Sequence, residues 1–363
     1  MRRFLSSLVL LALLLWGIPA AGQAPSPKLY VCNQGEATVS IIDMTSKTLE
    51  TTVDLKERGF SENAKPHHVV AEPDGSHWYV TLIGANTILK FNSNNKIVDR
   101  LNNFEVPGLL SLAPKKKVLY AGRSMSAVNP PKSLGMIDRS TMEVMKRVNT
   151  FFPRPHPLAV KPNGNYTFIA SLATNQLMGI NTQTRETKLT RLGGTTQTPV
   201  QFAMTPDGSR LIAGGQKTGQ LLVFDATNAP SLSVIDTLDV GKQPWHPVID
   251  RNSGLAYVPN KMSNSISVVD VSDPSVQATI RGDGLAQPHG TVLTADGEFL
   301  FVSNNNREGS HEPSGKNGVV TVIDTDTNEI VKIIEVGKYP TGIGTYGGQQ
   351  VTMAGSDGED GSP

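Results

Sequence analysis

The sequence predicts an all-β fold, a seven-bladed β-propeller, and two observations lead to that prediction. Short runs rich in β-branched and aromatic residues fill the chain, separated by Asp-Gly and Asn-Gly turns, and no long helical period interrupts them. One pattern also recurs, in which a proline opens a strand, a turn follows, and a large apolar residue 13 positions later marks the next strand. Units of four antiparallel strands that repeat at intervals of about 40 to 50 residues are typical of propeller blades.

The repeat has seven copies. The offset of 13 residues runs from Pro66 to Tyr79 and from Pro288 to Phe301, and four intervening copies keep it. Each unit continues with a third strand that ends in Asp, as in TVSIID, and with a shorter fourth strand such as KIVDRL. The recurring Asp residues are expected to bond turn amides. The strand-opening prolines are Pro66, Pro107, Pro155, Pro199, Pro244, Pro288 and Pro340.

The seventh copy is split between the two ends of the chain. Pro340 begins a first strand, but too little sequence follows it for a complete blade. The missing second strand is found near the N-terminus, where Tyr30 stands in LYVCN. The N-terminal strands are therefore expected to complete the last blade, which closes the ring over residues 28–346 and removes two exposed strand edges.

The segments outside this repeat have their own patterns. Residues 1–22 combine a basic start, an apolar run and small residues, which is the layout of a cleaved secretory signal and too short for a stable membrane span. We therefore expect a periplasmic or extracellular protein with no membrane span after cleavage. Residues 347–363 form an acidic tail that is expected to be disordered.

Composition narrows the partners. Lys and Arg total 33 against 32 Asp and Glu, so there is no net field to attract nucleic acid. The single cysteine, Cys32, cannot form an intramolecular disulfide and lies in a predicted strand, where we expect it to be buried. These features predict a monomer that binds a small-molecule ligand or a protein partner.

Four tetrapeptides at corresponding positions carry a family resemblance. They are YVCN at 30–33, YVTL at 79–82, YVPN at 257–260 and FVSN at 301–304. The chain resembles the YVTN-repeat β-propeller proteins through these motifs, over nearly all of residues 28–346. The resemblance implies the fold and does not by itself imply a reaction.

The register of the repeat gathers the histidines. Five of the seven histidines occupy the first or second position after a strand-opening proline, and Trp245 stands at the first position of the fifth unit. The first strand of each blade lines the central channel of a propeller, so we expect equivalent positions to surround one mouth of that channel. The histidines are His67, His68, His156, His246 and His289.

Two chemistries are open for such a cluster. Neutral imidazole is a frequent ligand of copper, zinc, iron and nickel, so the cluster is a candidate site for copper or another transition metal, or for haem. Histidines at this position also pack at the channel mouth or contact an organic ligand in propellers that bind no metal. The sequence leaves both alternatives open.

Two long insertions between second and third strands, RSMSAVNPPKS and NNNREGSHEPSGKNG, are expected to lie on the same face as the strand-opening prolines. Their polar side chains could overhang the histidines and contact a ligand. In a lactonase-like hydrolase, Glu308 or Glu312 would serve as base and Arg123 as oxyanion partner. The candidate contacts in these insertions are Arg123, Arg307, Glu308, His311 and Glu312.

No known catalytic motif is complete. The sequence has no GxxxxGK[ST] loop, no HExxH, no GxSxG and no CxxCH. The leading hypothesis is therefore ligand or partner binding at the channel mouth. A metal- or haem-dependent redox protein and a lactonase-like hydrolase are the alternatives.

Overall fold

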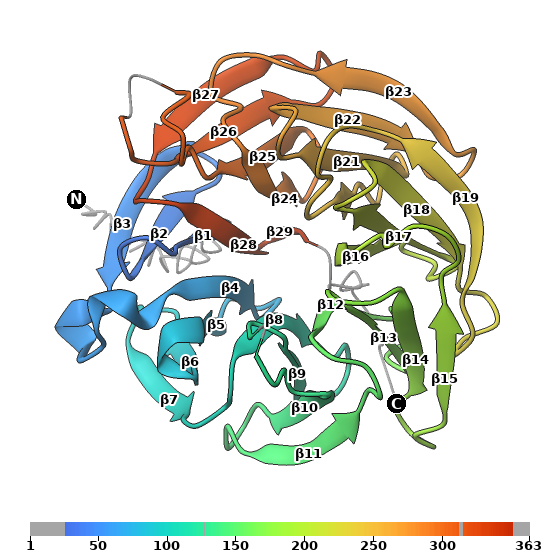
Figure 1. The fold of residues 1–363 in the computed structure, drawn as a ribbon. Helices are drawn as coiled ribbons and strands as arrows, with labels where there is room; N and C mark the ends of the chain where they lie inside the picture. The colour runs from blue at the N-terminus through green and yellow to red at the C-terminus, as the bar shows by residue number, and fades with distance from the viewer. Residues whose placement is uncertain (1–25, 127, 312–314, 351–363) are drawn as a thin grey trace, which may run out of the picture.

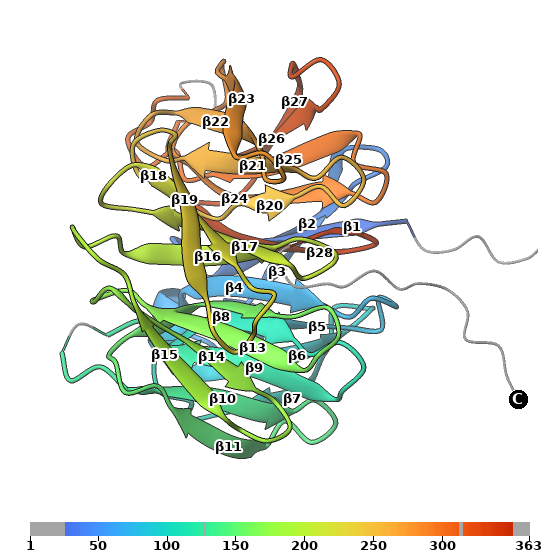
Figure 2. The same ribbon diagram turned by 90° about the vertical axis from the view of Figure 1, so that its right-hand side faces the viewer.

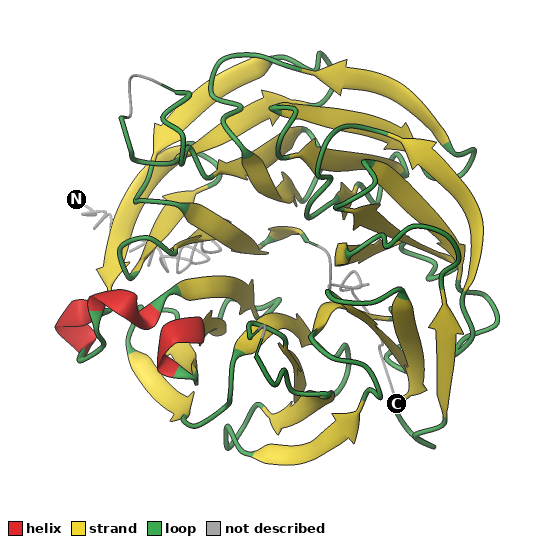
Figure 3. Ribbon diagram, in the orientation of Figure 1, coloured by secondary structure: helices red, strands yellow, loops and turns green. Residues whose placement is uncertain are grey.

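The computed structural model describes residues 26–126, 128–311 and 315–350 and confirms the predicted β-propeller. Seven small antiparallel sheets surround a central channel (Figure 1), and Figure 2 shows the same ring from its edge. Among the described residues, the helices are three short 3₁₀ turns (Figure 3), none of which is long or apolar enough to cross a bilayer. These turns are η1 (Lys56–Arg58), η2 (Glu62–Ala64) and η3 (Ile83–Ala85).

Each blade contributes four strands in the order from channel to rim. The innermost strands are β4 (Pro66–Ala71), β8 (Pro107–Leu112), β12 (Pro155–Val160), β16 (Pro199–Met204), β20 (Val248–Ile249), β24 (Pro288–Thr294) and β28 (Pro340–Tyr346). The second strands are β5 (His77–Leu82), β9 (Val118–Arg123), β13 (Tyr166–Ser171), β17 (Arg210–Gly215), β21 (Leu255–Asn260), β25 (Phe299–Asn304) and β1 (Lys28–Asn33).

The outer half of each blade repeats in the same way. The third strands are β6 (Thr87–Asn92), β10 (Ser133–Asp138), β14 (Gln176–Asn181), β18 (Gln220–Asp225), β22 (Ser265–Asp270), β26 (Val319–Asp324) and β2 (Thr38–Asp43). The fourth strands are β7 (Ile97–Leu101), β11 (Val144–Asn149), β15 (Thr187–Arg191), β19 (Ser233–Asp239), β23 (Ser275–Ile280), β27 (Ile330–Glu335) and β3 (Thr48–Asp54).

The last blade closes the ring as predicted. Strand β28 pairs with β1 in a register that joins Tyr346 to Lys28 and Pro340 to Asn33, and β2 and β3 complete the sheet. The apolar core is divided into seven clusters, each packed between two adjacent blades. The seam between the closing blade and the β4–β7 blade is filled like the others, with Tyr30 stacked on Trp78 at a ring-centroid distance of 5.0 Å.

Repeated polar residues have structural roles. The asparagine of the YVCN and YVPN motifs, Asn33 or Asn260, is buried and donates to two hydroxyls of the third strand. The aspartates that end the third strands accept turn amides, as Asp270 does from Ser272 and Asp273, which confirms the expectation from sequence. Cys32 is buried and free, also as expected.

The C-terminal segment differs from the prediction at its beginning. Residues 348–349 form strand β29 (Gly348–Gln349), which adds to the channel edge of β24, and Gln349 bonds Asp250 and the Ala295 carbonyl. The ordered chain therefore extends past residue 346, because the amide of Gln349 has buried partners. The rest of the predicted tail, residues 351–363, and the predicted signal, residues 1–22, lie outside the described residues.

Candidate ligand-binding site

The backbone at the start of every innermost strand is irregular in the same way. The residue before each strand-opening proline has a positive φ between 46° and 59°, although none of the seven is glycine. Directly after the proline, the pairing with the second strand is interrupted, so that Pro66 pairs with Leu82 but Val69 is the next residue to pair. Such bulges change the direction of side chains and recur next to functional sites. The interrupted positions are those that hold the histidines.

The five channel histidines lie close together at this end of the channel. The ring centroids of His67 and His156 are 5.7 Å apart, and those of His68 and His246 are 6.3 Å apart. The ring of His289 follows at 4.7 Å from that of His246. Four blades therefore contribute rings to one cluster, which we call the histidine cluster.

The fifth blade is distorted to join this cluster. The backbone N–H of His246 donates to the carbonyl of His289, and the Thr291 hydroxyl donates to the carbonyl of His246. Pro247 follows His246 and has no N–H to donate to a strand ladder. Strand β20 accordingly begins late, at Val248.

Two of the rings have hydrogen-bond partners at Nδ1, and two nitrogens of other rings have none. The backbone N–H of Leu110 donates to Nδ1 of His68 at 3.2 Å, so the neutral ring of His68 carries its proton on Nε2. Nδ1 of His156 lies 2.6 Å from the Ser124 hydroxyl. By contrast, Nε2 of His67 and Nδ1 of His289 are buried and have no hydrogen-bond partner.

Burial keeps the histidines neutral. Their side chains are 3 to 6 % exposed, and this desolvation lowers the pKa of His67 to about 4, with a further contribution from the Lys261 charge. Burial also lowers the pKa of His68 to about 3. Burial and neighbouring imidazoles place the pKa values of His156, His246 and His289 well below the ordinary value. At neutral pH the cluster is a set of uncharged donors and acceptors.

A small cavity and strand β29 lie beside the cluster. A cavity of about 10 Å³, room for roughly one water molecule, is lined by His68, His246, Gln201 and Gln350 among others. Gln350 follows β29, and its side-chain oxygen accepts from the backbone N–H of Thr345. Strand β29 lies near the middle of the ring (Figure 1), where it pairs with the last residues of β24. The innermost strands begin at the other end of the channel, which we call its open end.

Partly exposed aromatic and basic side chains lie at that open end. Nζ of Lys261 is 4.6 Å from the ring centroid of Trp245 and 5.6 Å from that of Tyr339. The Trp245 ring in turn lies 5.2 Å from the ring of His289. Burial, together with the positive charge of Arg307, lowers the pKa of Lys261 to about 8.

This lowered pKa predicts selective acylation of Lys261. At pH 8 about half of the Lys261 amines are neutral, against roughly 0.3 % for an ordinary lysine. We expect acetic anhydride at pH 8 to modify Lys261 several-fold faster than the exposed Lys217, with the ratio falling toward pH 10.5. Peptide mass spectrometry measures both rates, and equal rates at pH 8 would contradict the prediction.

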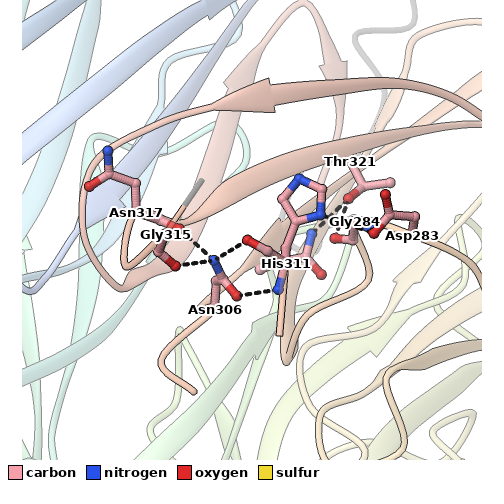
Figure 4. Close-up of polar contacts among 8 residues, drawn as sticks. Asp283, Gly284, Asn306, His311, Gly315, Asn317 and Thr321 are labelled. Carbon is pink, nitrogen blue, oxygen red and sulfur yellow. Dashed lines mark hydrogen bonds and ion pairs between the residues drawn. The ribbon is translucent and has the colours of Figure 1, made fainter. Parts of the chain in front are cut away.

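Two residues predicted to overhang the histidines are directed elsewhere. Arg123 is an ion-pair partner of Glu105 and donates to the Ser133 hydroxyl at 2.7 Å, so local partners hold it against its own blade. His311 is buried, with its backbone N–H bound to Asn306 and its Nδ1 3.1 Å from Asp283 (Figure 4). Local partners therefore occupy Arg123 and His311, and their contact with a ligand stays a prediction.

The other predicted loop residues have mixed outcomes. Arg307 does reach the open end of the channel, where its guanidinium carbon is 5.6 Å from the Tyr339 ring centroid. Glu308 is exposed, and Glu312 lies outside the described residues. Because Arg123 is paired with Glu105, the arginine and glutamate set suggested for a lactonase is not assembled in the described residues.

The sequence reasoning missed residues that contact the cluster. Ser124 and Lys261 each stand 17 residues after a strand-opening proline, directly after the second strand, and Gln34 holds the same place in the closing blade. Gln34 lies 3.4 Å from Nδ1 of His67. The register that located the histidines could have located these residues too, because the end of every second strand faces the same mouth.

The metal hypothesis finds no support in the present arrangement of side chains. Within the described part of the chain, no three His, Cys, Asp or Glu side chains are grouped so that they could hold one metal ion. The rings stack and tilt against one another, and Nδ1 of His68 is already occupied by a backbone N–H. The site does not fit a metal as it stands, and metal binding stays a prediction.

The fold and the site define a seven-bladed β-propeller with a buried histidine cluster at one mouth of its channel. No protein-family model matches the chain. Antigen Lp49 of Leptospira interrogans is 31 % identical over 114 residues, which are 30 % of this chain and 25 % of that protein. The match thus spans a quarter of the relative's length.

Two solved structures show the same fold. A functionally unknown protein from Desulfotomaculum acetoxidans has a TM-score of 0.70 at 14 % identity, covering 88 % of this chain and 98 % of its own. The periplasmic gluconolactonase of Pseudomonas aeruginosa has a TM-score of 0.69 at 15 % identity, covering 88 % of this chain and 99 % of its own. At these identities the similarity establishes the architecture alone.

Proposed function

We propose that this chain is an exported β-propeller that binds a small-molecule ligand at the histidine-lined mouth of its channel, without turning it over. The observation that carries the proposal is the pair of buried, unpartnered nitrogens on His67 and His289. A buried polar atom without a partner costs about 1–3 kcal/mol, and a ligand that supplies the missing hydrogen bonds recovers this cost. Partly exposed Trp245 and Lys261 give the site an opening toward solvent.

A ligand screen tests the proposal. Small acids, sugars, lactones and amino acids are added to the protein, and binding is followed by thermal stability and by the histidine Cε1–H signals in NMR spectra. We expect at least one compound to raise the Tm and to shift the cluster signals while leaving His77 unchanged. His77 lies at the start of β5, at the other end of the blade.

Variants decide whether the cluster is the site. The double substitution His67→Ala, His289→Ala should weaken binding at least tenfold, whereas His77→Gln should leave it within twofold. The proposal fails if no compound binds, or if the double variant binds as tightly as the unmodified chain.

The alternative functions are outcomes of the same experiments. Stoichiometric copper, zinc, iron or nickel in untagged protein would replace this proposal with a metal-dependent one, and a Soret band after haem addition would indicate a haem protein. Hydrolysis of lactones above the buffer rate would favour the lactonase-like alternative, in line with the fold shared with a gluconolactonase. A lactonase would need an oxyanion partner other than Arg123, which is paired with Glu105.

Export is also part of the proposal. It is supported by the signal-like pattern of residues 1–22 and by a structural neighbour whose name includes the word periplasmic. We expect protein recovered outside the cytoplasm to begin at Gln23 when its N-terminus is sequenced. An intact Met1 in that fraction would contradict the proposal.

A further inference from the structure

The open end of the channel holds two cations that share aromatic neighbours. Lys261 follows β21, and Arg307 lies in the insertion after β25, so two adjacent blades supply them. Both lie over the ring of Tyr339, each 5.6 Å from its centroid, and Lys261 also lies over Trp245. The Trp245 ring lies 5.2 Å from that of His289, so Lys261 is next to the histidine cluster and Arg307 reaches it through the shared ring of Tyr339.

The two charges are not neutralised within the described residues. The ion pairs of the described chain involve other groups, and neither Lys261 nor Arg307 has a carboxylate within 4.0 Å there. Lys261 is near the rings of Trp245 and Tyr339 and acts on neutral His289, and Arg307 lies over Tyr339. Lys261 is partly buried and Arg307 is exposed, and the Arg307 charge acts on Lys261. A partly buried cation beside a like charge is unfavourable, and an anion bound between the two would relieve this repulsion.

The histidine cluster supplies hydrogen-bonding groups beneath the cation pair. Nε2 of His67 and Nδ1 of His289 belong to side chains that are 6 % and 3 % exposed, and neither nitrogen has a partner. The Lys261 charge is close enough to act on both rings. The unpartnered nitrogens therefore lie within reach of the Lys261 charge, and Arg307 shares the Tyr339 ring with Lys261.

We propose that the ligand of this site is a small organic oxyanion, a carboxylate or a phosphate ester, held by Lys261 and Arg307. Its remaining polar atoms are directed at His67 and His289, and Trp245 and Tyr339 pack against its apolar part. A cationic ligand would be repelled, and a neutral one would leave both charges uncompensated. The inference rests on the proposed function, to which it adds the chemical class of the ligand.

Fluorescence of Trp245 reports binding directly. The chain beyond residue 22 contains two tryptophans, and the other, Trp78, is fully buried in the core. Matched probes are benzoate against its neutral analogue benzamide, and glycerol 3-phosphate against glycerol, titrated to 10 mM in dilute buffer. We expect one anion of the two pairs to change the Trp245 signal at a Kd at least tenfold below that of its neutral analogue. The signal should vanish in Trp245→Phe.

Charge variants test the two cations. Lys261→Gln and Arg307→Gln should each weaken the anion at least tenfold, Lys261→Arg should retain affinity within about threefold, and added salt should weaken binding. Lys217→Gln is the matched control, because Lys217 follows β17 on the same face, is exposed and lies in a different blade. It should leave the Kd within twofold.

The outcomes separate this inference from the proposed function. Tight binding of benzoate alone assigns a carboxylate, and tight binding of glycerol 3-phosphate alone assigns a phosphate. The inference is overturned if anions and neutral analogues bind equally, if neither anion binds at 10 mM, or if Lys261→Gln binds normally. A neutral compound that binds through His67 and His289 would leave the proposed function standing while overturning this inference.

Discussion

Acidification from pH 7 to pH 5 should remove about 4 kcal/mol of folding free energy through His67 and His68 alone. Their pKa values are lowered to about 4 and about 3 in the folded chain, against 6.5 when unfolded. The unfolded chain therefore binds more protons in this range, so stability is lost as pH falls below 6.5. The loss levels off only below the folded-state values.

The surroundings of these rings resist protonation. Lys261 and Arg154 supply positive charge, and the imidazoles oppose charge on one another. His156, His246 and His289 add to the effect in the same direction. The expected loss is a large part of the 5–15 kcal/mol that holds a typical domain together.

Urea unfolding at pH 7, 6 and 5 measures the effect. His67→Gln should reduce the loss between pH 7 and 5 by about 2 kcal/mol. The control His77→Gln should change it less, because His77 is only partly buried. Carboxylates titrate mainly below this window, so a flat stability profile from pH 6.5 to 5 would show that the rings are not held neutral by burial.

The fold was predictable because its determinants are local. Each blade begins at a proline, and the constant offset from Pro66 to Tyr79 and from Pro288 to Phe301 reflects one turn geometry that is repeated around the ring. The closure was predictable for the same reason, since the unpaired strand after Pro340 requires a partner and β1 was the strand left over. No long-range information was needed beyond counting the units.

The clustering of the five histidines was predictable from the sequence only in part. Repeat register indicates which residues stand at the channel mouth, and all five rings lie there. Register does not reveal the bulge after each proline, so it cannot explain how the adjacent His67 and His68 both take part. It also cannot show which nitrogens remain without partners, since that depends on groups such as the Leu110 N–H from a neighbouring blade.

The long insertions were predicted least well. The side chains of Arg123 and His311 pair with Glu105 and Asp283. These two acidic residues do not recur at fixed positions of the repeat, so the register could not predict the pairs. Lys261 was missed although its position in the repeat is regular, because a lysine directly after a strand is usually exposed to solvent. Its importance comes from Trp245 and Tyr339, which three-dimensional packing brings around it.

Substitution of Trp78 by Ala should lower the free energy of unfolding by about 3–5 kcal/mol, because it empties the seam at which the ring closes. Trp78 is fully buried, stacks on Phe91 at 3.9 Å and on Tyr30 of β1 at 5.0 Å, and donates to Asn95 at 3.1 Å. The loss is measured by urea unfolding, with Trp78→Phe retaining most of the aromatic packing and costing less.

The substitution creates a cavity at the closing seam, and this position has a second consequence that a truncation elsewhere in the core would not have. In Trp78→Ala, amide hydrogens of β1 and β28 should exchange faster than those of β13, since the closing blade packs on the emptied seam and β13 does not. The matched truncation is Phe168→Ala, on β13 itself, in the seam with the β16–β19 blade, and it should reverse that order at a comparable cost. The histidine cluster joins β4 to blades across the channel, and Gln34 of the closing blade lies beside His67. A loosened closing seam should therefore also weaken ligand binding, and undiminished affinity in Trp78→Ala would mean that the cluster is held without the closed ring.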